Sequence, residues 1–231
     1  MKKFLFIIGI IVMTFISSCD NKKTEKITEP KPVKPALPVL KVYNMGGVDD
    51  EIVDGITQKL KTIYDSTVFA GNVPFVESAH IANCNLGDNR YWAKGMFDDL
   101  RGRVNLKKQI TLVIVNGEVC TWDGTKSGHA VLGLSLMNHN LSLIAYERFK
   151  TNKLNDVNNI MKIVMHELGH SVGNLVAGND SLRFHCDNEE CLMRIAGNKY
   201  PYRKITKYCS SCDSVMRAKG FKTDKMNLEE N

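Results

Sequence analysis

The residues best suited to chemistry are His166-Glu167-Leu168-Gly169-His170, two histidines one helical turn apart with a carboxylate beside the first. On an α-helix, residues four positions apart project side by side, so both imidazoles can reach one metal ion. Glu167 lies about 100° around the helix from His166, given 3.6 residues per turn, so it borders the ion without joining the histidine pair. That is the position of a general base acting on metal-bound water. The alternative is a solvated helix face with two ordinary histidines.

A second group of metal-binding residue types follows about fifteen positions later. It comprises His185, Cys186, Cys191, Met193, Cys209 and Cys212. The cysteines are spaced as C-x4-C and then C-x2-C, an arrangement typical of a structural zinc site held by four thiolates.

The element that must position the first group is a helix from about Asn155 to Gly173. Apolar residues recur through it at three- and four-residue steps, as expected of one buried helix face. They are Val157, Ile160, Met161, Val164, Leu168 and Val172. Asn155 and Asp156 are N-cap candidates, and Gly173 is the residue type that ends helices in the left-handed region.

The chain before this helix alternates strands and helices. Hydrophobic periodicity predicts helices over 49–65 and 92–102, and strands over 39–43, 67–76, 110–115, 118–122, 131–136 and 141–146. The strand 110–115 is almost wholly apolar, as expected at the centre of a sheet. The Asn116-Gly117 turn favours a hairpin between this strand and 118–122.

In their order, these motifs resemble those of the archaemetzincins, a family of zinc metalloproteases in the metzincin clan. The resemblance implies an α+β zincin fold with an α/β-type upper half, a twisted mixed sheet, an active-site helix, a Met-turn and a C-terminal four-cysteine zinc knuckle. It implies a catalytic zinc held by His166, His170 and His185, with Glu167 as the base and Met193 in the Met-turn. A second, structural zinc would be held by Cys186, Cys191, Cys209 and Cys212.

The resemblance also implies that an edge strand before the helix takes the substrate as an added antiparallel strand, and residues 141–146 hold that position. The chain departs from the family in the eleven residues, 174–184, that separate Gly173 from His185. Asp180 and Asp187 are therefore alternative third ligands. We favour His185 because it immediately precedes the first cysteine of the knuckle.

The N-terminus predicts export. Lys2 and Lys3 precede an apolar run over 4–16, which is shorter than the roughly 20 residues that span a bilayer. Ile16-Ser17-Ser18-Cys19 resembles a bacterial lipobox, so we expect a signal peptide over 1–18 and a lipid anchor at Cys19. An ordinary secretory signal is the alternative. Residues 19–38 are rich in proline and lysine and predict a disordered tether, which leaves 39–231 as one catalytic domain.

The composition argues against a nucleic-acid partner. Of the 31 basic and 25 acidic residues, seven lysines and three acids lie in 1–38, so the remaining chain has a net charge of only +2. Exported thiols normally oxidise, so disulfides Cys186–Cys191 and Cys209–Cys212 are an alternative to zinc. We favour zinc, since metal-bound thiolates resist pairing. Cys84 and Cys120 form either a disulfide or two buried thiols.

Two functions stay open at this point. The first is a monomeric, lipid-anchored zinc metallopeptidase with two zinc ions per chain, acting on a peptide or protein. Tyr200 and Tyr202 would then lie near the substrate pocket, either as oxyanion donors or as packed aromatics. The second is a zinc-stabilised surface binding protein without catalytic activity.

Overall fold

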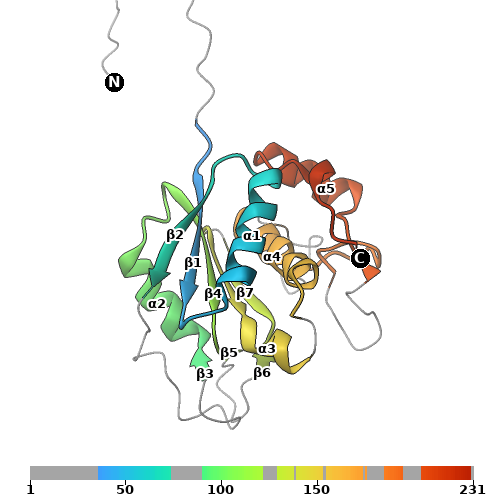
Figure 1. Cartoon of the computed structure of the whole chain (residues 1–231). Coiled ribbons are helices and arrows are strands. Elements are labelled where there is room, and N and C mark those ends of the chain that lie inside the picture. The colour runs from blue at the N-terminus through green and yellow to red at the C-terminus, as the bar shows by residue number, and fades with distance from the viewer. Residues whose placement is uncertain are drawn as a thin grey trace, which may run out of the picture. The chain divides into compact units, whose positions relative to one another are not determined.

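A five-stranded mixed sheet with the order β2-β1-β4-β8-β7 lies at the centre of the computed structural model (Figure 1). The structure describes residues 36–73, 90–121, 129–137, 139–152, 155–173, 175, 185–194 and 204–229. Several residues singled out in the sequence lie outside these ranges, namely Cys19, Cys84, Asp180, Tyr200 and Tyr202, as do 1–35 and all of 174–184 except Leu175.

Four parallel strands and one antiparallel strand make up this sheet. The parallel strands are β1 (Val39–Met45), β2 (Thr67–Val73), β4 (Gln109–Val115) and β8 (Leu141–Ala145). The antiparallel strand β7 (Gly133–Leu136) pairs with β8 at one edge. A smaller sheet contains β3 (Arg90–Trp92), β5 (Glu118–Thr121) and β6 (His129–Val131) in the order β3-β5-β6.

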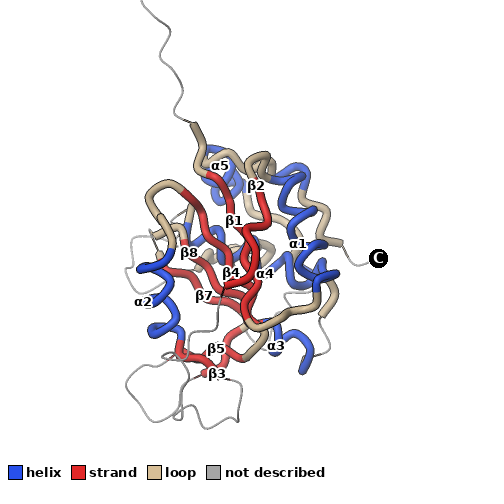
Figure 2. The backbone as a smooth tube through the Cα atoms, turned by 60° about the vertical axis from the view of Figure 1, so that its left-hand side comes forward, coloured by secondary structure: helices blue, strands red, loops and turns tan. Residues whose placement is uncertain are grey.

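Helices cover both faces of the main sheet (Figure 2). α2 (Ala93–Arg103) covers one face, and α1 (Asp50–Ile63) and α4 (Val157–Ser171) cover the other. The other described helices are α3 (Tyr146–Thr151) and α5 (Ser210–Ala218), and a 3₁₀ turn over Thr223–Lys225 follows. Alternating side chains of β4 separate two cores. Leu112 and Ile114 join a cluster with α1 and α4, whereas Val113 and Val115 join one with α2. All seven residues of β4 are buried, as its apolar sequence predicted.

The edge of the sheet differs from the sequence prediction. Residues 141–146 were expected to be an edge strand, but β8 is buried and lies between β4 and β7. The outer strand is β7. The predicted strand 131–136 divides at Leu132 into β6 and β7, so one run of sequence serves two sheets. Tyr146 does not extend β8 but begins α3.

The predicted hairpin between 110–115 and 118–122 is also wrong. β4 already pairs on both sides, with β1 and β8, so neither of its edges is free for β5. A tight bond from Gly117 N to Val115 O, 2.9 Å long, turns the chain away, and β5 pairs with β3 and β6 instead.

The long helix α4 begins where its cap residues predicted. The Asp156 side chain accepts a hydrogen bond of 2.9 Å from Asn159 N. The expected left-handed end at Gly173 is wrong, because the chain does not adopt a positive φ there. A side chain at position 173 would instead be too close to its neighbours, since a Cβ added there would lie 2.7 Å from the Gly169 carbonyl oxygen.

The C-terminal segment forms hydrogen bonds with both α1 and α4. Lys222 N donates to Ile63 O at 2.7 Å, and Asn158 Nδ2 donates to Glu229 O at 2.8 Å. α4 itself is buried on nearly all sides, including polar positions such as Lys162 and Ser171. None of the described helices has both the length and the apolar character needed to cross a membrane.

Candidate metal centres

Three histidines converge at the C-terminal half of α4. His166 Nε2 and His170 Nε2 lie 3.1 Å apart, and the ring of His185 is centred 5.2 and 5.0 Å from their rings. One nitrogen from each ring lies within 4.8 Å of the other two. Two nitrogens bound tetrahedrally to one zinc at 2.0–2.1 Å would be about 3.3 Å apart, so the pair on α4 has the spacing that zinc requires. Asp187 is exposed and is not part of this cluster.

Backbone carbonyl groups orient the imidazole rings of the two histidines on α4. His166 Nδ1 lies 2.6 Å from Leu192 O, and His170 Nδ1 lies 3.3 Å from Leu175 O. If each Nδ1–H donates to its carbonyl, the Nε2 lone pair of each ring is left for a metal. Burial lowers the pKa of His170 to about 3 and that of His185 to about 4. The imidazoles are therefore neutral at physiological pH, as ligands must be.

Glu167 follows His166 on α4 and places its side chain against the edge strand β7. Only 6% of the residue is exposed. Ser135 Oγ donates to its carboxylate oxygen Oε2 at 2.7 Å. Burial raises the pKa of Glu167 to about 7, and the bond from Ser135 opposes this rise. A carboxyl group with a pKa close to the working pH is well matched to accepting and returning a proton.

Met193 lies in a turn closed by a 2.8 Å bond from Arg194 N to Cys191 O. Its side chain packs on Gly169, the residue before His170. An added Cβ at Gly169 would lie 3.1 Å from Met193 Cε and closer still to its sulfur. Glycine is thus required at this helix position for the methionine to approach.

The four cysteines form a second cluster. Cys186 Sγ and Cys209 Sγ are 3.7 Å apart, and all four sulfur atoms lie within 4.8 Å of one another. A disulfide would require about 2.05 Å, whereas two sulfurs bound tetrahedrally to zinc at 2.3 Å would be about 3.8 Å apart. None of these four thiols is in a disulfide in the structure. Neither of the disulfides considered above, Cys186–Cys191 or Cys209–Cys212, is therefore formed, and the spacing of Cys186 and Cys209 fits two ligands of one zinc ion.

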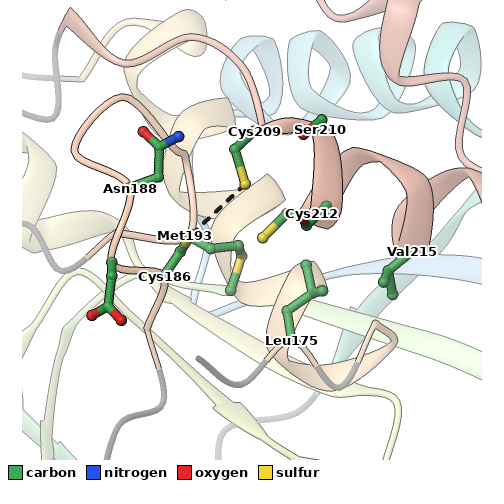
Figure 3. Close-up of a pocket in the computed structure, with 10 residues that line it drawn as sticks. Leu175, Cys186, Asn188, Met193, Cys209, Ser210, Cys212 and Val215 are labelled. Carbon is green, nitrogen blue, oxygen red and sulfur yellow. Dashed lines mark hydrogen bonds between the residues drawn. The ribbon is translucent and has the colours of Figure 1, made fainter. Parts of the chain in front are cut away.

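Hydrogen bonds already favour a thiolate in this cluster. Cys191 Sγ accepts from Met193 N at 3.4 Å and from Cys209 N at 3.3 Å. A bond from Cys212 is the largest cause that lowers the pKa of Cys191, to about 5. Figure 3 shows the side chains of Cys186, Cys209 and Cys212 on the wall of a cavity of about 460 Å³.

The two clusters are joined through the neighbours of the cysteines. His185 directly precedes Cys186, and Leu192, which follows Cys191, supplies the carbonyl that orients His166. Tyr208, which precedes Cys209, donates its hydroxyl to Met165 O at 2.6 Å, one residue before His166. The sequence prediction missed Leu192 and Tyr208, since a backbone carbonyl has no sequence signal and a tyrosine usually packs.

Ser135 and Gly133 were also missed. Both lie on β7, which the sequence analysis did not place against the helix. An added Cβ at Gly133 would lie 2.7 Å from Glu167 Cγ, so this glycine makes room for the carboxylate. Only the pairing of β7 with β8 and the packing of α4 on both strands bring these residues to the site.

Comparison with known proteins supports the fold. Neither protein-family models nor curated protein sequences match this chain. Among solved structures, an archaemetzincin from Methanopyrus kandleri is similar with a TM-score of 0.59 and 17% identity, over 79% of this chain and 95% of that one. A zinc-dependent peptidase from Methanocorpusculum labreanum is similar with a TM-score of 0.55 and 17% identity, over 77% and 99%. The chain is thus a mixed α/β protein with the fold of these two proteins and a four-cysteine cluster.

Proposed function

We propose that this protein is a zinc-dependent metallopeptidase that hydrolyses peptide bonds. The observation that carries this proposal is the convergence of three neutral histidines beside a buried Glu167, on a fold shared with a zinc-dependent peptidase. His166, His170 and His185 would hold the catalytic ion, and three protein ligands leave a fourth position for water or substrate. A structural zinc site is normally closed by four protein ligands and has no need of this carboxylate.

Zinc bound there would act as a Lewis acid, polarising the scissile carbonyl and acidifying a water molecule. Glu167 takes the proton from the attacking water and returns it to the leaving amine. The carbonyls of Leu192 and Leu175 hold the rings of His166 and His170 in their ligating orientation. Met193 provides the apolar floor of the site, which corresponds to the Met-turn of metzincins.

We place a second, structural zinc on Cys186, Cys191, Cys209 and Cys212, giving two zinc ions per chain. The sulfur spacing and the backbone donors to Cys191 support this assignment. Such a site closes the C-terminal segment onto α4, because Cys209 and Cys212 lie at the start of α5 whereas Cys186 and Cys191 lie in the loop after the histidines.

The substrate would bind along β7 rather than along 141–146. β7 is the outer strand of the sheet and packs against α4, and among the described residues no strand pairs with its free side. A peptide added there as an antiparallel strand would run past Glu167. A peptide or protein is therefore the expected partner, and the near-neutral charge of the domain gives no reason to expect nucleic acid.

We further propose that the chain is exported, lipidated at Cys19 and held as a monomer at a bacterial membrane by its acyl chains; the N-terminal sequence supports export and lipidation. Mass spectrometry of the N-terminal peptide tests this part separately. A lipid-modified Cys19 at the mature N-terminus is the expected result, and an unmodified chain beginning elsewhere contradicts it.

The activity is tested with the mature chain and its Glu167→Ala variant, after zinc analysis of both. We expect both to contain zinc and only the wild type to cleave a peptide library, with a rate ratio of at least about 100. Equal turnover would contradict the role of Glu167. A fully metallated wild type without turnover would favour the binding-protein alternative.

A further inference from the structure

The carboxylate of Glu167 is held by an edge strand. Ser135 Oγ lies 2.7 Å from Oε2 of this carboxylate and 2.7 Å from the main-chain oxygen of the same residue. Among the described residues, Ser135 is the one side chain with a hydrogen bond to the Glu167 carboxylate. One hydroxyl therefore contacts both the side chain and the backbone of the proposed base.

The pleat of β7 explains how Ser135 reaches α4. Leu134 and Leu136 pack into the cluster beside α2, so Gly133 and Ser135 project from the opposite face. A Cβ at Gly133 would lie 2.7 Å from Glu167 Cγ and 2.9 Å from Oε1. The two residues define a seat for the carboxylate, with space at one position and a hydrogen-bond donor two residues later.

Two further serine hydroxyls lie near Ser135, those of Ser142 and Ser171. Its partner across the strand pair is Ser142, with the two Oγ atoms 2.9 Å apart. Ser142 donates its single hydroxyl hydrogen to Ser171 Oγ at 2.9 Å, in the last turn of α4, so its oxygen faces Ser135 as a polar neighbour and not as a second donor. Ser135 is thus held on β7 by the pairing with β8, with its one hydrogen directed at Glu167 of α4.

We propose that Ser135 is a positioning residue for Glu167: its hydroxyl holds Oε2 and leaves Oε1 for the attacking water. This inference rests on the proposed peptidase function. It assigns to β7 a second role beyond pairing with substrate, because the strand that would align the peptide also aligns the base. Replacing Ser135 with alanine removes the bond but preserves the backbone of β7. The effect should therefore fall on kcat and not on KM.

The kinetic test compares Ser135→Ala with the wild type in zinc-loaded protein. We expect kcat to fall by about 10- to 100-fold, as for other residues that orient an active group through one hydrogen bond, with KM within about twofold and zinc content unchanged. Ser135→Thr, which keeps a hydroxyl, should recover most of the lost kcat. Ser142→Ala removes a neighbouring buried hydroxyl but no bond to Glu167, so it should lower kcat less than Ser135→Ala does.

A second variant, at Gly133, tests the space beside the Glu167 carboxylate. Gly133→Ala places a methyl group against Glu167 Cγ and should also lower kcat without loss of zinc. An unchanged kcat in Ser135→Ala, or an equal fall in KM and kcat without rescue by threonine, would overturn the inference while leaving the peptidase function intact. A wild type without turnover would overturn the proposed function itself and the positioning role with it.

Thermal unfolding provides a readout that does not need turnover. The Tm of four zinc-loaded proteins is compared: wild type, Ser135→Ala, Glu167→Ala and the double variant. We expect Ser135→Ala to lower Tm less when Glu167 is already alanine, because the bond between them is then absent. Additive Tm shifts would show that the two side chains do not interact and would overturn the inference.

Discussion

Replacing Gly169 with alanine tests the packing beneath the histidines, because two opposing effects can be weighed. In a helix interior, alanine is favoured over glycine by about 1 kcal/mol. A Cβ at Gly169 would lie closest to the Met193 sulfur, and also 3.1 Å from Met193 Cε and 3.3 Å from Leu175 Cδ1, all inside ordinary contacts of about 3.5–4.0 Å. Crowding of this kind in a packed core costs about 1–3 kcal/mol.

The net effect of Gly169→Ala is therefore a loss of up to about 2 kcal/mol of unfolding free energy, despite the better helix former. Gly102→Ala is the matched control. Gly102 lies in α2, has no positive φ, and an added Cβ there would meet nothing within 4 Å. This variant should gain up to about 1 kcal/mol, so the two substitutions should move stability in opposite directions.

Thermal unfolding monitored by circular dichroism is the assay, with about 2–4 °C expected per kcal/mol for a domain of this size. Zinc content should be measured in parallel, because pushing Met193 away also moves the neighbouring Leu192, whose carbonyl orients His166. If both alanine variants raise Tm by a similar amount, the contact between Gly169 and Met193 does not exist as described and the reasoning is refuted.

Three further predictions concern the ligands, the link between the clusters and alkaline pH. His185→Ala should lower zinc content by about one ion per chain in elemental analysis, whereas Asp187→Ala should not; the reverse result would reassign the third ligand. Tyr208→Phe removes the bond to Met165 O and should weaken zinc binding by the histidines up to about tenfold in chelator competition, with equal affinities as the contrary outcome. Burial raises the pKa of Tyr64 from 10.0 to about 12. Since the unfolded chain ionises first, stability present below pH 10 is lost toward pH 12, and Tyr64→Phe should flatten this decline in Tm.

Local patterns predicted the elements better than their partners. The cap at Asp156, the apolar face of α4 and the buried strand β4 all follow from residue types over a few positions. Pairing depends on distant segments that compete for the same edge. Asn116-Gly117 favours a hairpin locally, yet β1 and β8 occupy both sides of β4 and exclude β5. The same competition places β7 outside β8, which a single sequence does not reveal.

In the candidate site, too, some residues could be predicted from sequence and others could not. The histidines and cysteines have distinctive side chains, and the structure brings the possible ligand atoms of each set within 4.8 Å of one another, whereas their binding of metal stays a prediction. The groups that hold them are generic: a serine hydroxyl, a leucine carbonyl, and a glycine needed for its lack of a side chain. Ser135 lies 32 residues before Glu167 in the chain, and it and Gly133 contact this residue only because the antiparallel strand β7 lies against α4.

The sequence order of the two clusters has a physical consequence. Three of the four cysteines have a neighbour that contributes to the histidine cluster: His185 itself, Leu192 through its carbonyl, and Tyr208 through its hydroxyl. A metal that fixes the cysteines therefore also fixes these neighbours, and less entropy is left to lose when the histidines bind their own ion. Filling the thiolate cluster should thus favour metal binding by the histidines. By linkage, metal at the histidines should stabilise the thiolate cluster to the same extent, so we expect the two clusters to fold as one unit although they share no ligand.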